Sequence, residues 1–183
     1  SLYDIHAIFV EKCARLGEGF LRLENAGYTV VSAYNAVKDP RKHRFLYQDY
    51  LWRGADMLGL GVAAFGYLGG VHEQNEAGLD QYEAKIEQGV LPVKRAFHLS
   101  PRDQLVREFV LQLKLGEVPA APFRERFGVD LLGELAEPLQ ELAAEGWLTW
   151  SREGVRLTRA GLLRADRILP HFYDDPFRNV RKN

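Results

Sequence analysis

The glycines near the middle of the chain have the clearest spacing for binding chemistry. Residues 59–64 (GLGVAA) match G-x-G-x-x-A, a pattern that lets backbone approach a dinucleotide pyrophosphate. That function also requires a strand before the pattern and a helix after it. Residues 50–58 are a poor strand and residues 65–70 are a poor helix. The pattern therefore indicates either a packed glycine turn or a loop that contacts another kind of ligand.

The other reactive side chains form no pattern typical of a catalytic or metal site. No two of the five histidines are four residues apart, and neither H-E-x-x-H nor G-x-S-x-G occurs. Cys13, the single cysteine, falls on the apolar face of an expected helix, where we expect an unreactive thiol. One cysteine cannot hold an iron–sulfur cluster or a zinc ion by itself. We therefore expect no catalytic or metal-binding residue in this chain alone.

The composition excludes several classes of protein. The 183 residues are 46% hydrophobic and 27% charged, with a net charge of -1, which is typical of a globular protein. That charge gives no overall attraction to nucleic acid or to an anionic membrane. No apolar run approaches the ~18 residues of a membrane span. With one cysteine and no secretory leader, the chain is expected in the cytoplasm.

The elements that must position the glycine pattern begin with a helix over residues 3–25, indicated by apolar residues at a spacing of three to four. β-branched and aromatic residues predict a strand over residues 28–34. A lone helix and strand cannot bury both faces of the strand. We therefore expect this segment to be the end of a partial (β/α) barrel whose earlier strands lie in a missing N-terminal segment.

The aromatic and glycine-rich residues 45–75 follow no helical period, so short strands and tight turns are expected there. A helix is predicted over residues 78–88 and another from Ser100, which is followed by proline and then Asp103 in a capping-box spacing. The later pattern predicts two further helices, a hairpin and a last helix. Their expected ranges are 123–127, 131–145 with a kink at Pro138, 147–158 and 159–172.

These elements predict an α+β fold with two domains. Residues 1–95 would form the end of the barrel with the glycine-rich loop, and residues 96–183 a winged-helix-like C-terminal domain. A winged-helix module that binds DNA or a protein, without catalysis, is the alternative function. Its recognition helix, residues 131–145, contains four glutamates and no lysine or arginine, which opposes DNA binding.

Three motifs in order resemble the oxygen-independent coproporphyrinogen III oxidase family of radical S-adenosylmethionine proteins. In that family an aromatic-rich strand leads into D-x-x-G-x-G-x-x-A, here Asp56 to Ala64. An asparagine and a Tyr-x-x-x-Ile helix follow, here Asn75 and residues 82–86. A Gly-Val-x-Leu-Thr-x-x-Gly ending matches residues 154–161, so the resemblance covers nearly the whole chain.

The resemblance implies a longer protein with an N-terminal C-x-x-x-C-x-x-C loop that holds a [4Fe-4S] cluster on a partial barrel. S-adenosylmethionine would bind that cluster and be cleaved to a radical that acts on a tetrapyrrole-like substrate. Without the cluster cysteines, this chain is expected to be inert and to need the missing barrel segment as its partner. The family includes a decarboxylase of haem biosynthesis, haem chaperones and less typical relatives.

The same resemblance places the glycine pattern beside the cofactor and substrate pocket. The matching residues on the cofactor side are Gly59, Gly61, Ala63, Ala64, Phe65 and Gln48. Those on the substrate side are Tyr47, Trp52, Arg53 and Asn75. Phe65 stands where the biosynthetic enzyme usually has a smaller aliphatic residue, and this departure argues against coproporphyrinogen as the substrate.

Overall fold

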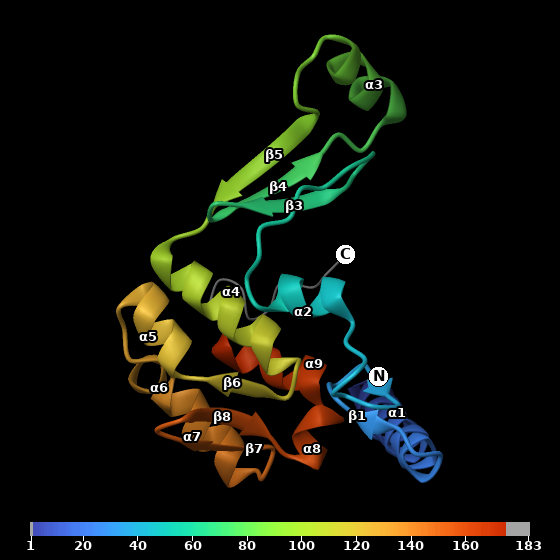
Figure 1. Ribbon diagram of the computed structural model, residues 1–183, viewed down its shortest axis with the longest axis vertical. Coiled ribbons are helices and arrows are strands. Elements are labelled where there is room, and N and C mark those ends of the chain that lie inside the picture. The colour runs from blue at the N-terminus through green and yellow to red at the C-terminus, as the bar shows by residue number, and fades with distance from the viewer. Residues whose placement is uncertain (1, 175–183) are drawn as a thin grey trace.

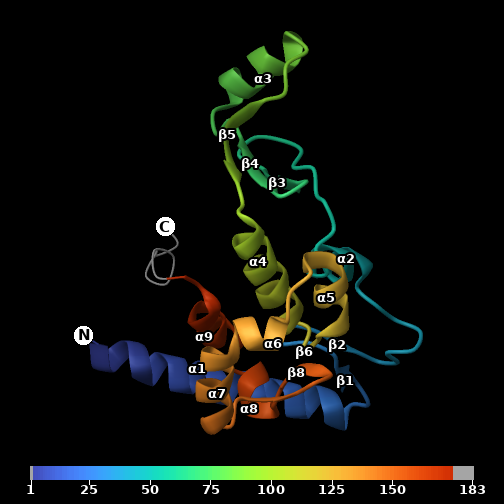
Figure 2. The ribbon, with the colours of Figure 1, turned by 90° about the vertical axis from the view of Figure 1, so that its left-hand side faces the viewer.

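A computed structural model describes residues 2–174, and it shows an arm that projects from a larger body (Figures 1 and 2). We call residues 57–98 the arm and residues 99–174 the body. The preceding helices α1 (Leu2–Asn25) and α2 (Leu46–Trp52) lie beside the body, with α2 between the body and the arm. The C-terminal domain was predicted to reach residue 183, and residues 175–183 lie outside the described part.

The first strand is shorter than predicted. β1 (Thr29–Val30) pairs antiparallel with β2 (Ala36–Val37), so the predicted strand over residues 28–34 is wrong beyond Val30. The hydroxyl of Ser32 accepts the N–H groups of Tyr34 and Asn35 at 3.1 and 3.0 Å. A serine that bonds nearby backbone in this way favours a turn over a strand.

The prediction of strands and turns for residues 45–54 is also wrong, because α2 occupies most of that segment. An ion pair one turn apart supports the helix, with Arg53 Nε 3.0 Å from Asp49 Oδ1. The aromatic pattern looked irregular because several apolar side chains of α2 face outward, Tyr47 and Tyr50 among them.

The arm is a small antiparallel sheet with one helix at its tip. The order is β3-β4-β5, formed by β3 (Phe65–Leu68), β4 (Val71–Asn75) and β5 (Val93–His98). The helix α3 (Leu79–Glu87) connects β4 to β5, which confirms the helix predicted there. β5 was not predicted, and the predicted domain boundary after residue 95 falls inside it; that boundary stays a prediction.

The body begins with α4 (Pro101–Leu113), and the predicted capping box is confirmed. The Ser100 hydroxyl accepts the Asp103 N–H, and the Asp103 carboxylate accepts the Ser100 N–H. The hairpin is confirmed as β7 and β8, and a strand that was not predicted completes a sheet of order β6-β8-β7. The remaining elements are β6 (Glu117–Pro119), α5 (Ala121–Phe127), α6 (Leu131–Glu134), α7 (Ala136–Ala144), β7 (Leu148–Ser151), β8 (Gly154–Leu157), α8 (Arg159–Leu162), α9 (Ala165–Ile168) and η1 (Leu169–Phe172).

Two of the helices predicted as continuous are broken. The helix over residues 131–145 breaks at Leu135, which lies between α6 and α7. Pro138 then falls in the first turn of α7, where a missing N–H costs nothing. The helix predicted over residues 159–172 is divided into three short helices, α8, α9 and η1. Each of them contributes buried residues.

The hydrophobic core lies in the body. Phe109 of α4 has no exposed surface, and its ring lies 4.7 Å from that of Phe172 and 6.5 Å from that of Phe123. Leucines from α6, α7 and β7 fill the space around these rings. Within residues 2–174, no helix is both long and apolar enough to cross a membrane.

Candidate functional site

The glycine loop, residues 58–64, is held from beneath by one buried asparagine. The side-chain amide of Asn75, which is 5% exposed, donates to the carbonyls of Gly59 and Gly61 at 2.9 and 3.0 Å. The backbone N–H of Asn75 also donates to the carbonyl of Ala64 at 2.9 Å. Both amide hydrogens are therefore used within the protein, so Asn75 shapes the loop.

The loop backbone satisfies only part of its own hydrogen bonding. Gly61, with a φ of 100°, donates to the Tyr82 hydroxyl at 3.1 Å, and Ala63 donates to the Glu76 carbonyl at 2.7 Å. Among the described residues, none accepts the N–H groups at positions 59, 60 and 62. These three backbone donors are therefore unused within the described part of the protein, and a ligand of the loop could accept hydrogen bonds from them.

The exposed side of the loop is apolar. Leu60 is 81% exposed, and the adjacent Phe65, at the start of β3, is 59% exposed. A side chain added at Gly61 would meet no atom within 4 Å, whereas one added at Gly59 would lie 2.5 Å from the Phe65 carbonyl oxygen. Gly59 is therefore required by the packing of the loop itself, and Gly61 borders open space.

The predicted site residues on α2 point in two different directions. The hydroxyl of Tyr47 donates to the sulfur of Met57 at 3.4 Å, which places Tyr47 at the base of the glycine loop. Gln48 turns the other way and accepts a hydrogen bond from Asn35, and Trp52 packs edge-on against Tyr34. The structure therefore brings Tyr47 and Asn75 to the loop and directs Gln48 and Trp52 away from it.

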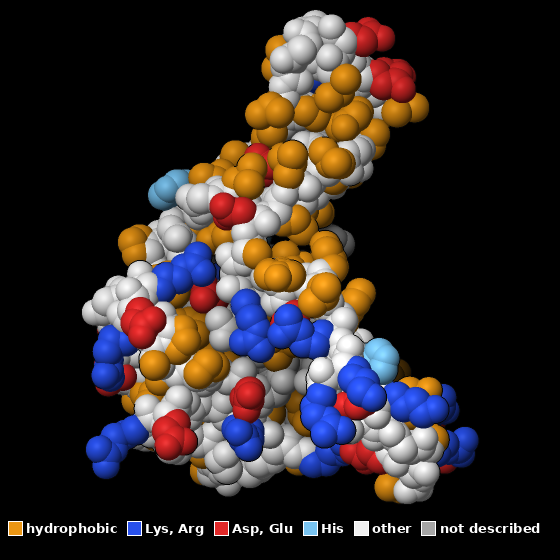
Figure 3. Space-filling view, viewed as in Figure 1, with side chains coloured by type: hydrophobic (Ala, Val, Ile, Leu, Met, Phe, Trp, Pro, Cys, Tyr) orange, Lys and Arg blue, Asp and Glu red, His pale blue; other side chains and the backbone are white. Residues whose placement is uncertain are grey.

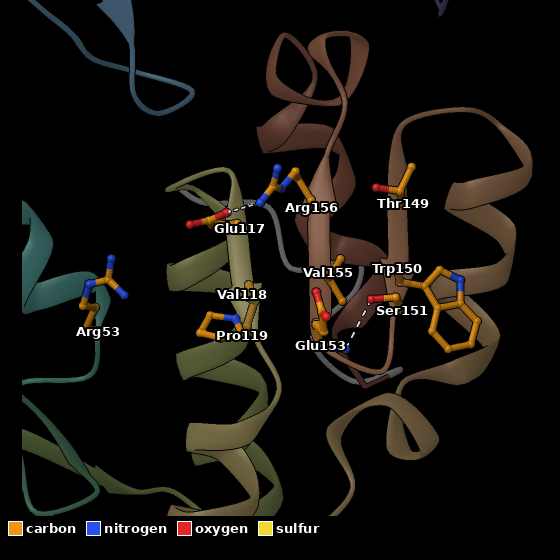
Figure 4. Close-up of a pocket in the computed structure, with 11 residues that line it drawn as sticks. Arg53, Glu117, Val118, Pro119, Thr149, Trp150, Ser151, Glu153, Val155 and Arg156 are labelled. Carbon is orange, nitrogen blue, oxygen red and sulfur yellow. Dashed lines mark hydrogen bonds and ion pairs between the residues drawn. The ribbon is translucent and has the colours of Figure 1, made fainter. Parts of the chain in front are cut away.

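Arg53 faces two cavities next to the body. The larger, about 510 Å³, lies between Arg53 and the outer face of the β6-β8-β7 sheet (Figure 4). Arg156 and Glu117 form an ion pair of 2.9 Å across that face, while Trp150 points away from Arg53. The smaller cavity, about 210 Å³, is also lined by Gln48. Neither cavity is lined by the glycine loop.

A polar contact joins the base of the arm to α4. The Arg107 guanidinium lies 3.6 Å above the ring of buried Tyr67, and its Nε donates to His72 Nε2 at 3.1 Å. Burial lowers the pKa of His72, and the adjacent Arg107 cation lowers that pKa further. His72 is therefore neutral where it accepts this hydrogen bond, because a protonated imidazole has no acceptor.

An ion pair between a buried carboxylate and a half-exposed arginine lies one residue further along α4. Glu108, which is 6% exposed, pairs with Arg126 of α5 at 2.6 Å and accepts a hydrogen bond from Gln112 at 3.2 Å. Burial raises the pKa of the Glu108 carboxyl, and Arg126 opposes that rise. Gly54 packs directly over the pair, because a side chain there would lie 2.5 Å from the carboxylate.

The described residues contain no group of three or more metal-ligating side chains. Cys13 is buried against the body, with its sulfur 3.4 Å from the carbonyl oxygen of Leu163. The donor set within residues 2–174 therefore does not fit an iron–sulfur cluster.

Part of the chain matches a known domain family, and a solved structure shares its fold. Residues 99–164 match the family described as the HemN C-terminal domain. A solved structure, coproporphyrinogen III oxidase (HemN) from Escherichia coli, described as a radical SAM enzyme, superposes with a TM-score of 0.67 at 21% identity. The superposition covers 85% of this chain and 39% of that one.

Two curated relatives of this chain carry the same name. An oxygen-independent coproporphyrinogen III oxidase from Pseudomonas aeruginosa is 29% identical over 146 residues, which is 73% of this chain and 32% of that protein. The enzyme of the same name from Helicobacter pylori is 30% identical over 108 residues, 57% of this chain and 24% of that protein. The chain thus spans about a quarter to a third of these relatives. The resemblance seen in the sequence is confirmed: the chain is similar to the C-terminal part of these proteins.

Several residues around the loop were missed as site residues. Tyr82 was noted only as the first residue of the Tyr-x-x-x-Ile motif, yet its hydroxyl accepts the Gly61 N–H. Arg107, His72 and Glu108 carried no motif. The pairing of β3 with β4 sets Tyr67 beside His72, and Arg107 of α4 contacts both side chains. These contacts depend on the tertiary structure.

Proposed function

We propose that this chain is the C-terminal part of an oxygen-independent coproporphyrinogen III oxidase-like radical S-adenosylmethionine protein. In this proposal the arm lines the cofactor and substrate pocket, and the body covers the barrel. The observation that carries the proposal is the glycine loop, with its unused N–H groups beside Phe65. The named relatives support a tetrapyrrole-like substrate class for the complete protein.

The apolar surface of the arm supports a covering role. Hydrophobic side chains gather over the arm and continue down to α2 (Figure 3). The exposed members include Tyr47, Tyr50, Leu58, Leu60, Phe65, Leu79, Ile86, Leu91 and Phe97. A contiguous apolar surface of this kind is unusual in a soluble monomer and typically marks an interaction site. The proposed occupant is the barrel segment that the relatives carry outside the matched region.

The loop fits a nucleoside better than it fits a metal. Gly61 borders open space, the N–H groups at positions 59, 60 and 62 could donate to an adenosine or to the amino-acid part of S-adenosylmethionine, and Phe65 could pack against a ring. When bound to a reduced cluster, S-adenosylmethionine supplies a radical that abstracts hydrogen. The residues of this chain would bind and orient that cofactor and exclude water, while the cluster ligands come from the missing segment.

Reconstitution tests the proposal. The chain is joined to an N-terminal segment with a C-x-x-x-C-x-x-C loop, the cluster is rebuilt without oxygen, and 5′-deoxyadenosine release is measured after reduction. We expect release from the joined protein and none from the chain alone. Gly61→Val should lower release by filling the open side of the loop. The matched control is Gly27→Val, which has a similar positive φ and equally open surroundings but lies outside the arm. No release with a fully loaded cluster would contradict the proposal.

The proposal of a winged-helix-like body is supported by the order of its elements, which is helix, strand, three helices and a two-stranded hairpin. Binding of DNA through α7 is disfavoured, since its exposed face carries Glu137 and Glu141. A gel shift at low salt checks this point. We expect no shift, and a shift that disappears as salt rises would favour the alternative function.

A further inference from the structure

We propose that Arg107 and Glu108 are positioning residues that hold the two ends of residues 54–67 and so set the placement of the glycine loop. The contacts themselves lie outside the proposed cofactor pocket. Their effect on S-adenosylmethionine rests on the proposed function, whereas their effect on the arm does not.

The two ends of this segment are closed against each other. The backbone of Met57 and that of Tyr67 exchange two hydrogen bonds of 2.7 Å. One step further out, Asp56 Oδ1 accepts the Gly69 N–H at 3.0 Å. The position of the loop is therefore coupled to the base of the arm. Contacts that fix Gly54 and Tyr67 also fix the position of the loop.

Consecutive residues of α4 contact these two points. Arg107 covers the Tyr67 ring and bonds His72, and Glu108 with Arg126 forms the surface under Gly54. Gln104, one turn earlier on the same face, donates to the Leu99 carbonyl at 3.1 Å. The base of the arm thus contacts one face of α4 through Gln104, Arg107 and Glu108.

The groups that face His72 decide how the contact responds to acid. Tyr67 of β3 lies 4.9 Å away ring to ring, Phe97 of β5 is the cross-strand partner, and Arg107 of α4 provides the cation. Glu108 and Asp56 act on the Arg107 cation from further away, and Arg126 opposes them. A backbone hydrogen bond at Gly66 partly offsets the lowering of the His72 pKa. Protonation of His72 would remove the acceptor and place a second cation against Arg107, so acid should release the arm.

Spin labels measure the placement directly in the full chain. Cys13 is replaced by serine, and exposed Glu83 of α3 and Glu137 of α7 are each replaced by cysteine and spin-labelled. Double electron–electron resonance between the two labels then reports the distance between arm and body. We expect Arg107→Gln to broaden the distance distribution about twofold, with Arg107→Lys in between because it keeps a cation over the Tyr67 ring. A distribution as narrow as that of the parent would overturn the proposal.

Gly54→Ala tests the second contact with a matched control. Gly54 and Gly27 share a φ of 83°, but a side chain at Gly27 would meet nothing within 4 Å. Gly54→Ala should broaden or shift the distance distribution, and Gly27→Ala should leave it unchanged. Equal effects of the two variants would contradict a role for Glu108 beneath Gly54.

Acid provides a readout that simple loss of folding would not reproduce. Lowering the pH below about 6.5, the ordinary pKa of histidine, should broaden the distribution in the parent but not in His72→Gln. A pH-independent parent distribution would overturn the His72 part of the proposal, even if Arg107→Gln fails to fold.

Activity of the joined protein then separates the two proposals. Arg107→Gln should raise KM for S-adenosylmethionine about tenfold and change kcat less, as loss of ground-state binding does. Release of the arm without any 5′-deoxyadenosine from the parent would refute the proposed function alone. An active parent whose KM is unchanged in a variant with a released arm would refute the link between arm and pocket.

Discussion

The arm and the body are stabilised by different forces. The body buries a continuous cluster of leucine, valine and phenylalanine side chains, while the described strands of the arm have one buried large hydrophobic side chain, Tyr67. The arm relies instead on hydrogen bonds that Asn75 and Arg107 donate and that the Tyr82 hydroxyl accepts. Its apolar residues face outward and resemble one side of an interface. A region held by polar contacts can have a well-defined structure within the protein and still be unstable when isolated from it.

The largest expected effect is in the body. Phe109→Ala should lower the free energy of unfolding by about 3–5 kcal/mol, because it removes a fully buried ring and leaves a cavity. Phe97→Ala, at a ring of the arm that is 53% exposed, should change it by less than about 0.5 kcal/mol. Urea denaturation followed by circular dichroism measures both. Similar losses in the two variants would remove the contrast between arm and body.

The next effect is local to the arm. Asn75→Ala removes two donors beneath the glycine loop and should cost about 1–3 kcal/mol of local stability. Hydrogen exchange at the Ala63 amide should accelerate, while the Leu113 amide in α4 should not. Gln74→Ala removes only one bond to the loop, of 3.3 Å to the Ala63 carbonyl, together with an exposed bond of 2.8 Å from Arg95, and should have a smaller effect at the loop. Acceleration at both amides alike would mean that the arm and the body open together.

A smaller loss of stability should appear in the arm and in the body together. Ser100→Ala removes the cap of α4, which carries core residues on one face and the arm on another, at a cost of about 1 kcal/mol. Exchange at Tyr67 and at Leu113 should rise together. Ser100→Asp, which restores an acceptor at the same position, should recover most of the loss, and failure to recover would argue against the cap.

The smallest effect depends on pH. The pKa of His72 is lowered in the folded protein, so the unfolded chain takes up a proton first as the pH falls below about 6.5. Stability should therefore fall on acidification through that range, and His72→Gln should flatten this part of the curve. Gln74→Ala keeps the imidazole and should retain the slope. An unchanged curve in His72→Gln would assign the slope to other groups.

Local signals predicted the fold well where they were strong. The cap at Ser100 and the hairpin at residues 148–157 follow from short-range rules and were confirmed. α2 was missed because its apolar side chains face outward and hide the helical period. β5 was missed because nearly all of it is exposed, so no alternation marks it.

The candidate site was harder to predict than the fold. The residues of the glycine pattern do lie together, but the role of Asn75 depends on where β4 passes under the loop. The direction of Gln48 depends on a helix that the pattern did not indicate. Arg107 and His72 are 35 residues apart and meet only through tertiary packing.

The helix α3 has no buried residue, yet it is tied to the glycine loop through the Tyr82 hydroxyl. Lys85, whose ammonium donates to the Val93 carbonyl at 2.8 Å, ties it to β5 as well. The same helix therefore contacts both the loop and the last strand of the arm. A displacement of α3 would strain the Gly61 hydrogen bond, so the tip of the arm and the glycine loop are mechanically coupled.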